Sequence, residues 1–174
     1  MKIKFNLRII EPYEFRQWWQ DDRVELLHAL QAFFADRDAD DALILGRIAG
    51  NSGADGLDDA LLPATNSGDL TSFSPPIAFV AGYWSAPSTT IGTCGVAIVR
   101  AEVSRLSDSY SDSAFSLVHL ASALLRHPDR SWDGDGSLRQ NLVTKLSAIR
   151  SDLKVNHPHM SHLIERIALA LDEA

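Results

Sequence analysis

Three histidines near the carboxyl end of the chain have the spacing H-x-H-x-x-H: His157, His159 and His162. Neutral imidazoles on one side of a helix can bind a metal ion, and residues three positions apart are helical neighbours. The cluster therefore indicates a metal site for a small metal-dependent enzyme or regulator. The alternative, which we favour, is a set of exposed side chains at a helix start, because Pro158 lies between the first two histidines. We expect no bound cofactor.

Two other segments share only some features of ligand-binding loops. Residues 133–137 (DGDGS) alternate acid and glycine as calcium loops do, but Leu142 occupies the twelfth position, where a bidentate Glu is required. A turn with a helix N-cap is the simpler interpretation. The glycines at 46, 50, 53 and 56 lack the lysine of a phosphate-binding loop and are accompanied by three aspartates. Nucleotide binding is therefore not expected.

Two further side chains of reactive type, His119 and Cys94, lack the sequence partners that catalysis requires. His119 lies in a stretch without charged residues, where a histidine is usually a hydrogen-bonded core residue, and Cys94 lies in an apolar segment. Sequence motifs of hydrolases and metalloproteases are missing from the chain. These observations predict a protein that is not an enzyme.

Aromatic and acidic residues are concentrated together between residues 11 and 41. Adjacent Trp18 and Trp19 point about 100° apart on a helix, so both are buried only if the helix is broadly covered. A Trp surrounded by charge is typical of a protein-binding hot spot, although burial of both rings against the core is the alternative. Tyr83-Trp84 forms a second candidate patch, which could also mediate self-association of a structural subunit. The predicted partner-binding residues are Trp18, Trp19, Asp21, Asp22, Asp36, Asp38, Asp40, Asp41, Tyr83 and Trp84.

The charge balance supports a protein partner. The chain has 16 Lys and Arg residues against 23 Asp and Glu residues, a net charge of −7. The acid is regional, because residues 11–69 hold 13 acidic and 4 basic residues and carry −9. This concentration of negative charge disfavours binding of nucleic acid, which requires clustered Lys and Arg, and favours binding of a basic protein. A solvated acidic face that only keeps the protein soluble is the equal alternative.

Length and cysteine usage limit the class of protein. A chain of 174 residues with 45% hydrophobic residues predicts one globular domain over 1–174. The single cysteine excludes an internal disulfide and favours a reducing compartment. The first ten residues do not form a signal peptide and no apolar run is long enough to span a membrane. We expect a cytoplasmic protein without membrane partners.

The elements that must position these residues are mainly helical. Apolar spacing predicts helices over residues 12–35 (with a second helix capped by Asp21-Asp22), 114–125, 138–153 and 160–171. Residues 42–49 (ALILGRIA) fit a strand or a helix end equally well. The Gly-, Asp- and Ser-rich stretch 50–74 predicts a long loop, with one helical turn at 57–62.

Three segments indicate strands. Residues 3–9 alternate apolar and polar side chains, and residues 77–84 and 92–100 are apolar runs separated by a polar connection. The order of elements predicts an α+β fold, a small antiparallel sheet with helices packed on one face and a mainly helical C-terminal half.

In this layout the chain resembles the immunity proteins of bacterial polymorphic-toxin and secretion-delivered effector systems. The resemblance lies in the segments KIKFNLRII, EPYEFRQWWQDDRVELL, AFVAGYW and GVAIVR and in the Gly/Asp-rich middle. It implies a single-domain α+β protein that binds its cognate toxin in the producing cell and blocks the active site, and it assigns no site residue. Acidic side chains that occupy the phosphate site of a nuclease would act in this way.

Overall fold

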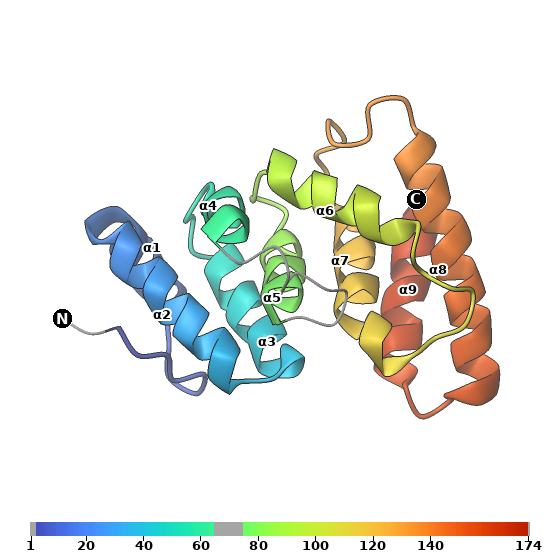
Figure 1. Cartoon of the computed structure of the whole chain (residues 1–174), viewed down its shortest axis with the longest axis horizontal. Helices are drawn as coiled ribbons and strands as arrows, with labels where there is room; N and C mark the ends of the chain where they lie inside the picture. Colours follow the sequence, from blue (N-terminus) through green and yellow to red (C-terminus); the bar gives the residue numbers. More distant parts are fainter. Residues whose placement is uncertain (1–2, 65–74, 174) are drawn as a thin grey trace.

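In residues 3–64 and 75–173, the parts of the chain that the computed structural model describes, all of the regular secondary structure is helical (Figure 1). Its helices are α1 (Pro12–Asp21), α2 (Arg23–Asp36), α3 (Ala39–Gly50), α4 (Leu57–Ala64), α5 (Pro75–Trp84), α6 (Thr93–Val103), α7 (Phe115–Arg126), α8 (Ser137–Asn156) and α9 (Ser161–Glu173), with a short 3₁₀ helix η2 (Asp112–Ala114) before α7. No strand occurs in these ranges, so the predicted α+β fold with an antiparallel sheet is wrong.

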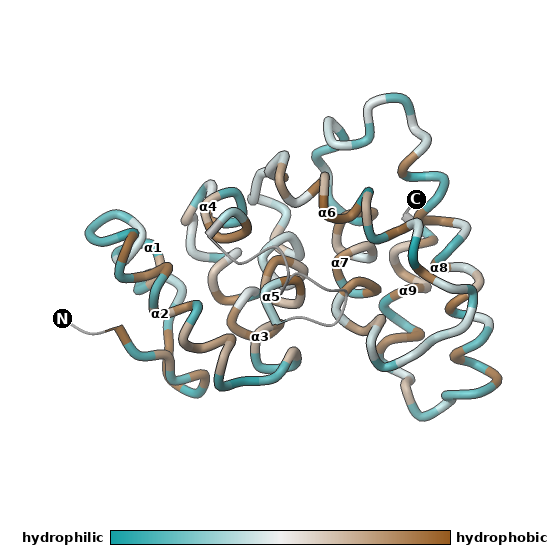
Figure 2. The backbone as a smooth tube through the Cα atoms, viewed as in Figure 1, coloured by the Kyte–Doolittle hydropathy of each residue, from teal (hydrophilic) through white to brown (hydrophobic). Residues whose placement is uncertain are grey.

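Helix α5 lies in the middle of the molecule. It packs between α3 on one side and α7 on the other, while α7 packs against α9 and α9 against α8 (Figure 1). The α1–α2 pair lies outside α3, and α6 contacts α4, α7 and α8. Figure 2 shows hydrophilic residues on turns and helix ends, including the turn between α2 and α3. None of the described helices has the length and apolar character that a membrane span requires.

The two apolar runs that predicted neighbouring strands are α5 and α6. Every residue of α5 from Pro76 to Trp84 is buried, because α3, α4 and α7 pack against this helix. An all-apolar run fits both the strand and the helix period, so it does not distinguish them. Pro75 and Pro76 stand in the first turn, where proline favours a helix.

Residues 3–8 alternate in burial without forming a strand, whereas Ile9, the last apolar residue of the predicted strand, is exposed. Ile3 is buried, Phe5 and Leu7 are half-buried, and the residues between them are exposed. Phe5 packs on Phe15 and Trp18 of α1, with ring centroids 5.5 and 5.7 Å apart. The period-two pattern thus arises because alternate side chains of this segment contact a helical surface. No neighbouring strand in the described residues forms backbone hydrogen bonds with it.

Glycines allow α3 and α5 to approach closely. A Cβ added at Gly46 would lie 2.0 Å from the Phe79 carbonyl oxygen, and one at Gly82 would lie 2.2 Å from the Leu43 carbonyl oxygen. Gly50 meets the backbone of α5 in the same way, one turn after Gly46. The glycines that were considered for a phosphate loop therefore include two that pack helices, and residues 42–49 are helical.

The helices predicted from apolar spacing agree with the structure. Asp22 separates α1 from α2 and caps α2, since its carboxylate accepts a hydrogen bond from the Glu25 amide at 3.0 Å. The DGDGS segment is a turn that starts α8, in which the Asp135 carboxylate accepts from the Ser137 amide at 3.0 Å. The predicted loop over 50–74 contains α4 where a helical turn was expected, and residues 65–74 lie outside the described residues.

Candidate functional site

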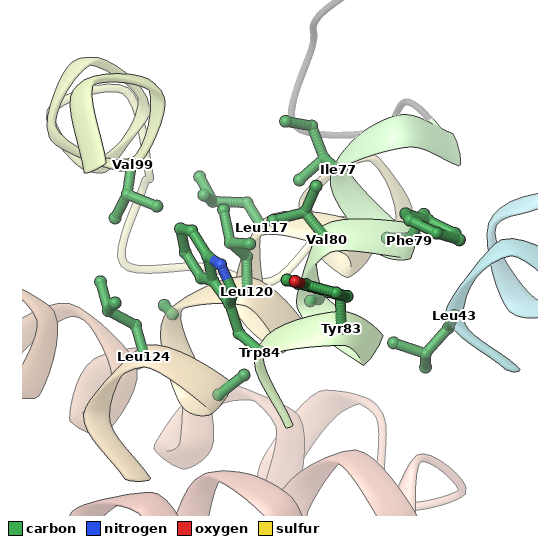
Figure 3. Close-up of a cluster of buried hydrophobic side chains, with 14 of the residues drawn as sticks. Leu43, Ile77, Phe79, Val80, Tyr83, Trp84, Val99, Leu117, Leu120 and Leu124 are labelled. Atoms are coloured by element: carbon green, nitrogen blue, oxygen red, sulfur yellow. The ribbon is translucent and has the colours of Figure 1, made fainter. Parts of the chain in front are cut away.

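Tyr83 and Trp84 form part of the core and not a surface patch. Their side chains are 0% and 1% exposed, among residues of α5, α6 and α7 (Figure 3). The Tyr83 hydroxyl donates a hydrogen bond to the Ala54 carbonyl at 2.7 Å, and burial, followed by the charge of Asp58, raises the pKa of Tyr83. Both residues are therefore inaccessible to a protein partner, and the sequence prediction for them is corrected.

Two aspartates of α4 hold the start of α6. Asp58 Oδ2 accepts hydrogen bonds from Trp84 Nε1 and from the Gly92 amide, both at 2.9 Å. Asp59 Oδ1 accepts from the Cys94 amide at 3.2 Å. Negative side chains at a helix N-terminus accept hydrogen bonds from its free amides and interact favourably with the positive end of the helix dipole. These two acids of the 11–69 segment thus have a structural role.

Neither tryptophan of α1 is a free anchor for a partner. Trp19 is 6% exposed, and its Nε1 donates to the Asp55 carbonyl at 3.0 Å. The Arg23 guanidinium stacks 4.2 Å above the Trp19 ring. Trp18 is half-buried against Phe5 and Phe15. The alternative interpretation, in which both rings complete the core, describes their positions better.

The predicted acidic surface is divided between the two ends of α2. Asp21 and Asp22 lie at the α1–α2 turn, whereas the remaining four predicted aspartates lie around the α2–α3 turn (Figure 1). Because α2 has 14 residues, the two groups are about 20 Å apart. We call the second group, formed by Asp36, Asp38, Asp40 and Asp41, the acidic corner.

The acidic corner keeps most of its charge unneutralised. Asp41 pairs with Arg37 at 3.3 Å, and the Asp38 carboxylate caps α3 by accepting from the Asp41 amide at 2.9 Å. Asp36 and Asp40 have no ion pair or hydrogen bond to the side chains described. Partial burial, followed by repulsion from Asp38 and Asp41, raises the pKa of Asp40. A cationic partner would relieve this repulsion.

An exposed apolar side chain adjoins the acidic corner. Ile44 is 42% exposed and follows Asp40 by four residues and Asp41 by three, so the three lie on one face of α3. Sequence reasoning missed Ile44, because the continuous run ALILGRIA does not indicate which of its members faces outward.

A pocket of about 460 Å³ opens between α3, α7 and α9. We call it the α3–α7–α9 pocket; it is lined by Asp40, Leu43, Arg47, Phe115, His119, His159, Met160, His162, Leu163, Glu165, Arg166 and Leu169. It therefore brings Asp40 of the acidic corner to two of the predicted metal-binding histidines. His119, Arg47 and Arg166 were not predicted as site residues.

Two of the side chains that line this pocket are arginines. Neither Arg47 nor Arg166 forms an ion pair with a carboxylate of the described residues, although Asp40 and Glu165 also line the pocket. Burial lowers the pKa of Arg166, and the charges of Arg47 and Arg126 lower it further. Arg166 thus experiences neighbouring cations more strongly than neighbouring carboxylates.

His119 is the buried polar group of the pocket. It is 8% exposed, packs on Phe115 with ring centroids 4.6 Å apart, and its Nδ1 is buried without a hydrogen-bond partner among the described residues. Burial, followed by the charges of Arg166 and Arg47, lowers the pKa of His119 to about 3. The imidazole is therefore neutral at physiological pH. The expectation of a hydrogen-bonded core histidine is corrected, because burial is present but the hydrogen bond is missing.

The three C-terminal histidines do not assemble as metal ligands. His157 packs on Tyr110 and on His159, with ring centroids 5.5 and 6.0 Å apart, whereas His162 lines the pocket. Within the described ranges, no three His, Cys, Asp or Glu side chains are grouped so that they could hold a metal ion. His162 is exposed in the first turn of α9, and His159 is exposed in the turn that precedes this helix. His157, by contrast, is half-buried and follows the last residue of α8, so the interpretation of exposed helix-start side chains does not describe it.

Comparison of the chain with protein-family models, with curated proteins and with solved structures gives no match. The candidate sites therefore rest on their own geometry.

Proposed function

We propose that this protein is a non-enzymatic inhibitor that binds and neutralises a basic protein toxin, in the manner of an immunity protein. The observation that carries the proposal is the acidic corner, where Asp36, Asp38 and Asp40 are exposed within five residues and one ion pair, Arg37–Asp41, offsets the charge. Such a field accelerates encounter with a cationic surface and repels polyanions.

The structure changes the residues assigned to this interface. Ile44 replaces Trp18 and Trp19 as the apolar contact, because it is exposed beside the carboxylates while the tryptophans pack inside. An exposed apolar side chain gives a partner a contact from which water is excluded when the complex forms. Asp21 and Asp22 lie at the far end of α2 and contribute only to the long-range field.

The proposal rests on surface chemistry and not on the layout that suggested immunity proteins. Of the segments that carried the resemblance, EPYEFRQWWQDDRVELL is helical as expected, whereas AFVAGYW and GVAIVR are helices in place of strands. Association with a basic toxin before its release places the protein in the cytoplasm of the producing cell. The other functions considered required a histidine metal site or an exposed Tyr83-Trp84 surface, and no observation favours either.

A charge-neutral variant of the acidic corner tests the proposal. The probe is the toxin domain that the proposal expects to be encoded next to this gene, and the measurement is its association rate at 50 and 300 mM salt together with protection in co-expression. The triple substitution Asp36→Asn, Asp38→Asn and Asp40→Asn should slow association about tenfold or more at low salt and reduce the salt dependence. Asn is isosteric with Asp and is itself a good N-cap, so α3 should remain capped.

The matched control neutralises three exposed acids elsewhere, Asp21→Asn, Asp112→Asn and Asp172→Asn. It changes the net charge equally but leaves the acidic corner intact, so association should slow much less. Equal slowing by both triple variants would show that only net charge matters, and no slowing by either would refute the electrostatic interface. A neighbouring gene for a metabolic enzyme, with no toxin partner, would refute the function itself.

A further inference from the structure

We propose that the α3–α7–α9 pocket is a binding site for a small organic carboxylate, whose charged end lies between Arg47 and Arg166. The apolar body of the ligand would lie against Leu43, Phe115 and Leu163, which line the same pocket. This site is separate from the proposed inhibitory interface, apart from the shared Asp40, and stands whether or not that interface exists.

The size and lining of the pocket suit a small molecule. Its volume of about 460 Å³ lies within the usual range for ligand sites, which combine mostly apolar walls with a few polar groups that orient the ligand. Three separate helices supply the lining, so the site depends on the tertiary structure and not on one local motif.

The two arginines provide the charge that a carboxylate requires. Arg47 comes from α3 and Arg166 from α9, and no carboxylate of the described chain pairs with either of them. Holding two guanidinium groups near each other is unfavourable without a counterion, and each can make two parallel hydrogen bonds to a planar carboxylate. A bound carboxylate therefore offsets the repulsion between the two arginines.

His119 adds a neutral hydrogen-bond donor. We place its single proton on Nε2, because a proton on Nδ1 would leave a buried donor without an acceptor. No hydrogen bond occupies Nε2 among the described residues, so Nε2–H is available to the ligand. The imidazole remains uncharged, so it orients the ligand by a hydrogen bond and adds no third positive charge.

The carboxylates at the pocket select against ligands with two negative charges. Asp40 and Glu165 line the pocket with the two arginines, so the acidic and basic side chains there are equal in number. A phosphate monoester, which carries close to two charges at neutral pH, would be repelled by these carboxylates more strongly than a carboxylate with one charge. We therefore expect a carboxylate in preference to a phosphate.

Calorimetric titration of the full-length protein at pH 7 tests the ligand class. The probe is 4-phenylbutyrate, and the comparison ligands are its neutral amide, phenyl phosphate and inorganic phosphate. We expect saturable binding of the carboxylate at a 1:1 ratio and at least tenfold weaker binding of the other three. Failure of the carboxylate to bind at millimolar concentration, or equal binding of the amide, would overturn the proposal. Tighter binding of phenyl phosphate or inorganic phosphate would overturn the assignment of a carboxylate.

Substitutions of the arginines locate the site. Arg166→Gln and Arg47→Gln should each weaken binding about tenfold or more, because each removes a charge-assisted contact, whereas Arg166→Lys should retain part of it. Arg16→Gln, at an exposed position on α1, is the matched control and should bind like the wild type. Unchanged affinity in both Gln variants, with unchanged circular dichroism, would show that the probe binds elsewhere.

Nuclear magnetic resonance tests the placement of the ligand in the wild-type protein, so the result does not depend on whether a variant folds. In ¹⁵N-labelled wild-type protein, binding of 4-phenylbutyrate should shift the His119 Nε2 resonance, while His28, exposed on α2, should not respond. A titration in which His28 shifts and His119 does not would refute the placement of the ligand.

Discussion

His119 shows how one residue can belong to the core and to a pocket together. Its position on α7, within a segment without charged residues, results in burial of the ring, while Arg47 and Arg166 reach it from α3 and α9. Burial and these charges both disfavour the imidazolium ion. The same environment keeps the imidazole available as a neutral donor.

This environment makes the stability of the protein depend on pH. The pKa of His119 is lowered from 6.5 to about 3, so between these values the unfolded chain binds a proton that the folded chain does not. The free energy of unfolding should therefore fall as the pH falls from about 6.5 towards 3, by about 1.4 kcal/mol per pH unit from this group. Urea unfolding at pH 7, 6 and 5 measures this slope.

Comparison of two variants isolates the contribution of His119. His127 contributes in the same direction because burial also lowers its pKa, so the wild-type slope alone does not identify the residue. His119→Gln should reduce the slope whatever its effect on absolute stability, and His28→Gln, at an exposed position, should leave it unchanged. Identical slopes in the wild type and in His119→Gln would contradict the assignment.

At the scale of elements, the close contact of α3 with α5 arranges the middle of the molecule. Gly46 and Gly50 allow the backbone of α3 to touch α5, and the contact is completed by Gly82 from the α5 side. A helix interior normally disfavours glycine by about 1 kcal/mol relative to alanine. These glycines are therefore explained by packing and not by local preference.

The substitution Gly46→Ala tests this explanation, because packing and helix propensity predict changes of opposite sign in the free energy of unfolding. Helix propensity alone predicts stabilisation by about 1 kcal/mol. The added Cβ would lie 2.0 Å from the Phe79 carbonyl oxygen, so the two helices must separate, and we expect destabilisation by about 2 kcal/mol or more. Thermal and urea unfolding measure the change, and a stabilised variant would show that the helices are not in contact there.

At the scale of the whole molecule, the buried apolar residues form one continuous cluster that runs from Ile3 near the start of the chain to Ala170 in α9. Helix α5 connects its two sides, because α3 and α7 pack on opposite sides of it (Figure 1). The cluster includes Trp19 on one side of α5 and Trp132 on the other. Unfolding of either side would expose apolar surface on α5.

A continuous core predicts one cooperative unfolding transition. Tryptophan fluorescence reports on both sides of the core, and circular dichroism at 222 nm reports on the helices, so the two curves should coincide in urea. The substitution Trp132→Phe restricts the fluorescence to the remaining tryptophans, and the midpoint by fluorescence should still match that by circular dichroism for the same variant. Separate midpoints would show that the α1–α2 pair unfolds independently of the rest.

Pattern reasoning succeeded where a helix has one apolar and one polar face. The spacing in α8 and α9 and the cap at Asp22 predicted those elements, because amphipathic periodicity and capping are local properties. It failed for α5 and α6, whose apolar runs carry no period. Among the site residues, those of the acidic corner were predicted from the sequence. Ile44, His119, Arg47 and Arg166 were not predicted as site residues, because their exposure and proximity depend on other helices.

The sequence by itself determined the amphipathic helices, their caps and the concentration of acid between residues 11 and 69, because propensity, periodicity and charge are properties of nearby residues. Only the tertiary structure decided that α5 is a buried helix, that Tyr83 and Trp84 lie in the core, and that the acid is divided between two ends of α2. It also brought Arg47, His119 and Arg166 from three helices into one pocket. Burial and long-range contact are decided by how helices pack, and a linear pattern does not record that packing.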